Sequence, residues 1–168
     1  MKSMVASLLV LARLQKGSMM SSSSDPDTAI RNERTLSASP SQVFAAFEQP
    51  DRLARWWGPD GFTNTFESFD FKPGGRWVFV MHGPDGTDYP NENVFREIQR
   101  DVRIVIEHVL PPWFSLTVTL TPQGEKTRMT WVQEFGSAEI AAKLRPICEP
   151  ANEQNFNRLE AVLAQGNE

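Results

Sequence analysis

Few residues in this sequence have the types and spacing that acid–base or nucleophilic chemistry requires. His82 and His108 are the two histidines of the chain. His108 alternates with Ile104 and Ile106, so its ring should share their face of a strand. It is then either a core histidine with satisfied hydrogen bonds or a polar group inside a cavity, and the sequence leaves both interpretations open. His82 precedes a Gly-Pro-Asp-Gly turn, which indicates a solvated side chain.

Two carboxylates and one thiol add little to this chemistry. Glu97 and Glu107 belong to neighbouring expected strands, and a carboxylate inside a cavity could act as a general acid or base if burial raised its pKa. Cys148 is the single cysteine, so an internal disulfide is excluded and a small buried thiol is expected. No metal-ligand spacing, nucleophile elbow or phosphate-binding loop occurs. We therefore expect no metal and no cofactor, the catalytic residues stay unassigned, and the balance is against enzymatic activity.

Two adjacent tryptophans, Trp56 and Trp57, end a short helical stretch just before Gly58 and Pro59. Neighbouring side chains on a helix diverge by about 100°, so both rings cannot point into one core from a helix. Trp56, with Leu53 three residues earlier, is expected to pack the short helices onto the sheet. Trp57 is expected to lie half-exposed at the mouth of a cavity. The alternative is that both rings are structural anchors.

Large side chains recur at alternate positions of two expected strands. Trp77, Phe79 and Met81 share one face of the first strand, and a similar row in the last strand ends on the polar Gln133. Such rows are either plain core or the wall of a cavity, because three bulky groups on one concave face are hard to pack without a gap. The candidate ligand cavity comprises Trp57, Phe69, Trp77, Phe79, Met81, Tyr89, Phe95, His108, Trp113, Met129, Trp131 and Gln133.

The elements that must position these residues follow from the hydrophobic pattern. Residues 29–38 alternate like an opening strand, and Ser39-Pro40 then provides an N-cap and a first-turn proline for a short helix. A second short helix carries the tryptophan pair. Six further strands follow, joined by turns too short for a crossover helix, so the sheet should be antiparallel. One of these turns, Pro73-Gly74-Gly75, suggests at least one residue with positive φ.

The chain should end in a long amphipathic helix. Phe156, Leu159 and Leu163 form an apolar stripe at helical spacing. Pro146 and Pro150 precede the stripe, so the helix should be kinked there, or a short helix should come before the main one. This helix is the only large amphipathic element available to cover the apolar face of the sheet.

Composition limits the partners and the location. The 168 residues carry a net charge of −4 and no basic stripe, which disfavours nucleic acid as a partner. Residues 1–27 are expected to form a flexible leader, with Met19 or Met20 as the favoured true start. Its apolar stretch, residues 5–12, is too short to span a bilayer and lacks a convincing cleavage site. We expect a cytoplasmic protein with one domain over residues 28–168.

Residues 71–98 resemble the signature of proteins similar to the activator of the heat-shock protein 90 ATPase. That family belongs to the START-like (SRPBCC, polyketide cyclase-like) superfamily. The supporting features are the Pro-Gly-Gly turn, the alternating Trp77, Phe79 and Met81, the Gly-Pro-Asp-Gly turn, Tyr89 and Glu97-Ile98. Residues 39–59 resemble the opening helix pair of the family, with paired tryptophans before Gly-Pro. Residues 103–108 and 127–135 are similar to its later strands, so the resemblance covers about residues 29–165.

This resemblance implies an α+β helix-grip fold: a curved antiparallel sheet of about seven strands wrapped on a long C-terminal helix, with two short helices after the first strand. It also implies a module that binds a small hydrophobic, lipid-like or polyketide-like ligand between sheet and helix. A cyclase or hydrolase using His108 or Glu97 is one alternative, and a chaperone-interacting domain is another. Nothing in the chain resembles the separate N-terminal domain of the co-chaperone, which argues against chaperone regulation. A homodimer stays open, as does the identity of the ligand.

Overall fold

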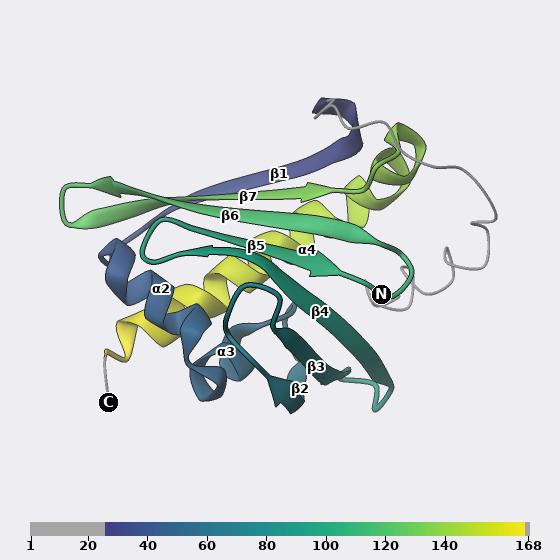
Figure 1. The fold of residues 1–168 in the computed structure, drawn as a ribbon, viewed down its shortest axis with the longest axis horizontal. Helices are drawn as coiled ribbons and strands as arrows, with labels where there is room; N and C mark the ends of the chain where they lie inside the picture. Colours follow the sequence, from purple (N-terminus) through teal and green to yellow (C-terminus); the bar gives the residue numbers. More distant parts are fainter. Residues whose placement is uncertain (1–25, 167–168) are drawn as a thin grey trace.

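The computed structural model describes residues 26–166, coloured along the sequence in Figure 1. The predicted division into a leader (1–27) and a domain (28–168) stays a prediction, because residues 1–25 lie outside the described residues, as do Met19 and Met20. The elements are η2 (Pro26–Thr28), β1 (Ala29–Leu36), α2 (Pro40–Glu48), α3 (Pro50–Trp56), β2 (Thr63–Phe69), β3 (Arg76–His82), β4 (Asp88–Gln99), β5 (Arg103–His108), β6 (Phe114–Gln123), β7 (Lys126–Glu134) and α4 (Ala138–Ala164).

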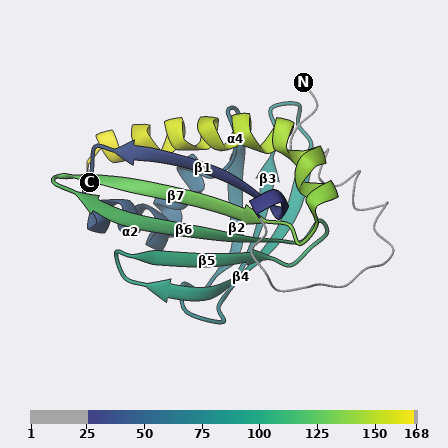
Figure 2. The ribbon, with the colours of Figure 1, turned by 90° about the horizontal axis from the view of Figure 1, so that it is seen from above.

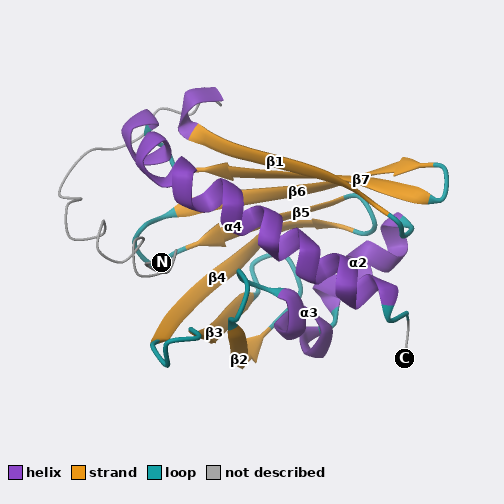
Figure 3. Ribbon diagram, turned by 180° about the vertical axis from the view of Figure 1, so that it is seen from behind, coloured by secondary structure: helices purple, strands orange, loops and turns teal. Residues whose placement is uncertain are grey.

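Seven strands form one antiparallel sheet in the order β1-β7-β6-β5-β4-β3-β2. The first strand therefore pairs with the last one, and all other neighbours are consecutive hairpins. Helix α4 crosses one face of the sheet, and α2 and α3 lie on the same side near its C-terminal end (Figure 3). The predicted α+β helix-grip arrangement is confirmed. No helix within residues 26–166 has the length and apolarity needed to cross a membrane.

Local sequence signals begin the two short helices. Ser39 caps α2, since its hydroxyl accepts a hydrogen bond from the backbone N–H of Gln42 and the Gln42 side chain accepts one from the Ser39 N–H. Pro40 and Pro50 occupy the first turns of α2 and α3, where a missing N–H costs nothing. The two helices are thus separate and stay close together on one side of the sheet.

The long helix α4 runs without a break through Pro146 and Pro150. Its first turns bend away from the rest of the helix (Figure 2). The interpretation of a kinked helix agrees with this path, whereas a separate short helix does not form. A proline inside a helix removes a backbone hydrogen bond and crowds the preceding turn, which accounts for the bend.

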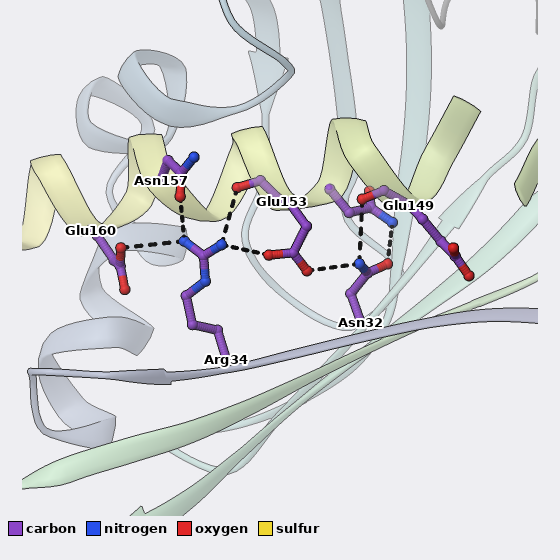
Figure 4. Close-up of polar contacts among 7 residues, drawn as sticks. Asn32, Arg34, Glu149, Glu153, Asn157 and Glu160 are labelled. Atoms are coloured by element: carbon purple, nitrogen blue, oxygen red, sulfur yellow. Dashed lines mark hydrogen bonds and ion pairs between the residues drawn. The ribbon is translucent and has the colours of Figure 1, made fainter. Parts of the chain in front are cut away.

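Polar side chains fasten α4 to the edge strand β1 (Figure 4). Arg34 donates hydrogen bonds to the Glu153 carboxylate at 2.5 Å, to Asn157 Oδ1 at 2.6 Å and to the Glu160 carboxylate at 3.2 Å. Asn32 donates to the Glu153 carboxylate at 3.0 Å. The carboxylates are about half-exposed, so each ion pair contributes less than about 1 kcal/mol. Together they fix the position of the helix along the strand.

Aromatic side chains fill the space between the sheet and the short helices. The rings of Trp56 and Phe47 pack edge to face at 4.9 Å, and those of Phe44 and Phe71 at 5.6 Å. Trp56 is fully buried and donates its indole N–H to the carbonyl oxygen of Ala46 at 3.0 Å. This ring packs the two helices against the core, as the sequence indicated.

Candidate functional site

A pocket of about 90 Å³ lies between the concave face of the sheet, helix α4 and two loops. The loops are the one after α3 and the one between β5 and β6. A single water needs roughly 10–15 Å³ of such space, so the pocket is several waters in size. Its lining consists of Trp57, Gly58, Phe79, Met81, Pro90, Asn91, Asn93, His108, Leu110, Pro111, Pro112, Phe114, Leu116, Trp131, Gln133, Phe135, Asn152 and Asn155.

Trp57 forms part of one wall. The sequence predicted a half-exposed ring, and this prediction is wrong because the ring is buried. Its exposed fraction is 8 %, and its ring lies 4.9 Å from that of Trp77 and 5.6 Å from that of Trp131. The two tryptophans can both be buried because Trp57 takes an extended conformation just beyond the helix, with ψ 127°. The angle of about 100° between neighbouring side chains on a helix therefore does not apply to Trp57, and both rings can point into the core.

Arg158 of α4 holds this loop in place. One terminal nitrogen of its guanidinium donates to the carbonyl oxygens of Gly58 at 2.9 Å and Pro59 at 3.0 Å, and to that of Trp57 at 3.3 Å. The other donates to the carbonyls of Arg55 and Phe62 at 3.0 and 2.8 Å. Burial lowers the pKa of Arg158, with Asp60 opposing the change. All five partners are backbone carbonyls, so Arg158 is a positioning residue for the wall that carries Trp57.

One end of the pocket is polar. His108 Nδ1 lies 3.1 Å from the carbonyl oxygen of Pro112, and Nε2 lies 3.1 Å from Asn91 Oδ1. The imidazole stacks on Phe114, with 4.9 Å between centroids and 3° between planes. Burial is the largest influence on the pKa of His108 and lowers it, opposed by the carbonyls of Pro112 and Leu110. The ring is therefore uncharged at neutral pH.

Further amides reach the pocket from β7 and α4. Asn152 donates to Gln133 Oε1 at 2.7 Å and to Asn32 Oδ1 at 3.0 Å, which links the pocket to the β1–α4 contact of Figure 4. Asn155 Oδ1 accepts the backbone N–H of Gly58 at 3.1 Å. These hydrogen bonds hold the amides in defined orientations, so the polar groups at this end of the pocket have fixed positions.

Two polar atoms of the lining residues have no hydrogen-bond partner within the described part of the chain. They are Asn93 Oδ1 and Trp131 Nε1, and Asn93 and Trp131 are each only 2 % exposed. Leaving a buried polar group unpaired costs about 1–3 kcal/mol, and few groups in native proteins do so. Two residues of the pocket lining therefore hold one acceptor and one donor that are buried without a partner.

The predicted cavity residues divide into two groups. The pocket is lined by Trp57, Phe79, Met81, His108, Trp131 and Gln133. Away from it, the aromatic core holds Trp77, Phe95 and Met129, with Phe69 packed against them. Tyr89 is buried with its ring 6.1 Å from that of Phe62, and Trp113 is 37 % exposed and donates to Glu107 at 2.9 Å. Five of these six residues face inward but lie farther along their strands than the pocket, whereas Trp113 belongs to the β5–β6 loop and its side chain points outward to Glu107.

Sequence reasoning missed the asparagines. Asn91 and Asn93 alternate with Phe95 along β4, so the period of two that identified Phe95 also assigned them to the inner face. Asn152 and Asn155 precede Phe156 on α4 and lie on its sheet-facing side. Their polarity concealed them, since an inward position is normally inferred from apolar residues.

The other candidates for chemistry lie outside the pocket. Glu107 binds Arg96 and Trp113, and the hydrogen bond from Arg96 is the main reason that the pKa of its carboxyl is lowered. Glu97 lies 3.6 Å from Arg103. Burial raises the pKa of the Cys148 thiol to about 12, so it stays protonated. Among residues 26–166 no group of three metal-ligating side chains is found.

His82 lies on the opposite face of β3 from Met81 and contacts Thr65 Oγ1 at 2.8 Å and Asp88 Oδ1 at 2.6 Å. The imidazole side chain is 34 % exposed and that of Asp88 is 63 % exposed. The order hydroxyl–imidazole–carboxylate resembles a nucleophile with its base, but it lies outside the pocket described above. His82 is thus partly solvated, close to its expected position.

Known structures share this architecture. A protein of Arthrobacter aurescens, 27 % identical, superimposes with a TM-score of 0.78 over 87 % of this chain and 92 % of its own. A protein of Nitrosomonas europaea, 21 % identical, reaches a TM-score of 0.79 over 84 % and 97 % of the two chains. The AHSA1 protein of Silicibacter pomeroyi, 20 % identical, reaches 0.67 over 83 % and 99 %. At the two lower identities the likeness concerns the fold alone.

No curated protein matches the chain. The family model described as activator of Hsp90 ATPase homolog 1-like protein matches residues 37–164, which include both short helices, β2 to β7 and all of α4. This match spans well over half of the sequence and contains every residue of the pocket. The chain therefore belongs to the activator of Hsp90 ATPase homolog 1-like family.

Proposed function

We propose that this protein is a binding module that holds a small, largely apolar molecule between its sheet and helix α4. The observation that carries the proposal is the pocket of about 90 Å³. Protein interiors are packed to crystal density and contain few voids larger than a water molecule. Apolar walls with a few oriented polar groups are typical of small-molecule sites. Trp57, Phe79 and Trp131 supply such walls here.

The side chains around His108 favour binding over catalysis. A cyclase or hydrolase needs a base or nucleophile beside the substrate, oriented by a third group. His108 instead contacts an amide oxygen and a backbone carbonyl. Within the described chain the pocket lining includes no carboxylate, cysteine, serine or threonine. An isolated neutral histidine among amides suits recognition of a ligand.

A chaperone-binding role finds less support. The large apolar side chains exposed in the described part of the chain are Val102 and Trp113. They flank β5 at its two ends, so they do not form one patch. Docking surfaces usually present contiguous apolar area of a few hundred Å².

Native mass spectrometry of freshly purified protein tests the binding function. We expect a species heavier than the chain by the mass of a small molecule, which is lost on denaturation. The variant Leu116→Trp places an indole ring where the pocket wall has a smaller aliphatic side chain, and it should abolish this species while leaving the protein folded. Glu125→Trp, in the β6–β7 turn, is the control and should retain it. The same mass for native and denatured protein, together with no uptake of neutral aromatic compounds, contradicts the proposal.

We also propose a cytoplasmic location. Cys148 is a buried free thiol, and proteins of reducing compartments typically keep cysteines in this state. Fractionation of cells that express the full chain with a C-terminal tag should recover it in the cytosolic fraction. Recovery with secreted proteins contradicts this location.

A further inference from the structure

We propose that the pocket selects an uncharged ligand, whose apolar body carries a neutral hydrogen-bonding group that both donates and accepts, such as a hydroxyl or a primary amide. This inference rests on the proposed binding function and specifies the chemistry of the ligand. It excludes carboxylates and phosphates as the bound form. Three features of the site support it: the charges of the lining, the kind of polar groups at one end, and the two unused polar atoms.

The lining contains no aspartate, glutamate, lysine or arginine among the described residues. A charged group that enters such a site loses its hydration and gains no counter-ion, which costs several kcal/mol. Arg158 contacts the loop that carries Trp57, but five backbone carbonyls already occupy its guanidinium. It therefore cannot serve an anionic ligand without releasing the loop.

Among the described residues of the lining, His108 is the one ionisable side chain, and it supplies no charge either. The groups that face it are Asn91, the carbonyls of Leu110 and Pro112, and the ring of Phe114. None of these is charged, and burial lowers the pKa of the imidazole. At neutral pH an acidic ligand would find only a neutral ring.

Amide side chains provide the polar end, and they come from three separate elements. Asn91 and Asn93 come from β4, Gln133 from β7, and Asn152 and Asn155 from α4. An amide side chain has both donors and an acceptor, so the amide groups that are not already paired within the protein can bind a neutral group of either kind. Such a set discriminates by hydrogen bonding rather than by charge.

The two buried polar atoms without a partner also favour a neutral ligand group. Asn93 Oδ1 can accept a hydrogen bond and Trp131 Nε1 can donate one, and neither has a partner within residues 26–166. A hydroxyl or a primary amide can donate and accept at once, whereas a carboxylate can only accept. Both atoms are buried, so pairing with a ligand requires a local change in side-chain conformation.

Calorimetric titration with 2-naphthamide and 2-naphthoate tests the selection, because the two probes have nearly the same shape and differ in charge. At pH 7.5 we expect the amide to bind at least tenfold more tightly. The apparent affinity for 2-naphthoate should rise as the pH falls toward 5.5, since the neutral fraction of an acid with a pKa of about 4 grows about tenfold per pH unit. Benzamide and benzoate repeat the comparison with smaller probes.

Variants at Asn93 test the assignment to residues. Asn93→Leu should weaken 2-naphthamide five- to tenfold while naphthalene binds as before. Its fold should persist, because replacing an unpaired buried polar group by an apolar one of similar shape is nearly neutral. Gln99→Leu, at the exposed end of the same strand, is the matched control and should change neither affinity.

The outcomes separate this inference from the proposed function. Equal affinities for the amide and the carboxylate at pH 7.5 overturn the selection of neutral ligands but leave the binding module intact. Unchanged 2-naphthamide affinity in Asn93→Leu overturns the role of that residue in the selection. Failure of both probe pairs and of naphthalene to bind, with no co-purified mass, overturns the binding function and this inference with it.

Discussion

The two ends of the concave face differ although the same strands build both. Toward the short helices the face is filled by aromatic and aliphatic groups, among them Trp77, Phe95 and Met129. Toward the β5–β6 loop it carries amides and a histidine and leaves an open pocket. We call these regions the packed end and the pocket end. The transition occurs within single strands, over one or two inward positions.

Strand β4 shows the transition most clearly. Phe95 is in the aromatic core, whereas Asn93 and Asn91, the next inward residues, line the pocket. In β5 the inward series runs from Ile104 and Ile106 to His108. A cavity forms where side chains stop filling the space between the sheet and the helix, and in β4 and β5 this place coincides with the change from apolar to polar inward residues.

The covering elements explain the difference. Helices α2 and α3 add rings over the packed end, such as Phe47 against Trp56 and Phe44 against Phe71. Over the pocket end only α4 and the two loops cover the sheet. The pocket thus lies where α2 and α3 do not cover the sheet. We therefore expect stability to depend mainly on the packed end and binding on the pocket end.

The largest expected effect is on stability at the packed end. Phe95→Ala should lower the free energy of unfolding by about 3–5 kcal/mol, as truncation of a buried phenylalanine usually does. Phe114→Ala at the pocket end removes a ring that is only partly buried and should cost less. Urea denaturation measures both. Equal losses would erase the proposed distinction between the ends.

The turn that pairs with Phe95 should show the next largest effect. Gly74 has a φ of 81°, as the sequence suggested for this turn, and open space around its α-carbon. A Cβ on Gly75 would lie 1.9 Å from the backbone oxygen of Asp70. Gly75→Ala should thus destabilise by about 1–3 kcal/mol, from crowding rather than positive φ. Gly74→Ala should cost about 1 kcal/mol, and a reversed order in thermal or urea unfolding would contradict this assignment.

Substitution of Arg158 should affect ligand affinity at the pocket end more than it affects the stability of the fold. Arg158→Lys keeps the charge but cannot reach five carbonyls at once, so the Trp57 wall should loosen. We expect binding of 2-naphthamide to weaken severalfold while the urea midpoint shifts only modestly. Arg103→Lys, on the outer face of the sheet, is the control. A loss of stability without a change in affinity would make Arg158 a purely structural residue.

The smallest expected effect is a pH dependence from His108. Its pKa is lowered in the folded state, so between that pKa and the unfolded value of about 6.5 the unfolded chain binds more protons. The free energy of unfolding should therefore be highest above pH 6.5 and decrease as the pH falls toward the folded pKa. In His108→Gln the urea midpoint should vary less with pH between 5.5 and 7.5 than in the parent protein. His82→Gln is the control. An unchanged slope in the first variant would mean that His108 titrates normally.

Much of the fold was predictable because its signals are local. Alternating residues predicted the strands and their inner faces, and Ser39-Pro40 predicted the start of the first helix. The family resemblance is carried by turns and aromatic residues that keep their spacing along the chain. Six of the predicted cavity residues line the pocket, and five of them face inward through the strand period, whereas Trp57 belongs to the loop after α3.

Only the tertiary structure decided how far the packed apolar core extends along each strand. A period of two cannot tell Phe95 from Asn93, since both face inward, and their difference comes from the helices above them. Trp57 is buried because Arg158, 101 residues later in the chain, ties its loop to α4. Sequence patterns report on neighbours within a few residues, whereas a pocket is bounded by contacts between distant segments. The sequence by itself therefore determined the elements and their faces, and long-range packing determined where they leave a pocket.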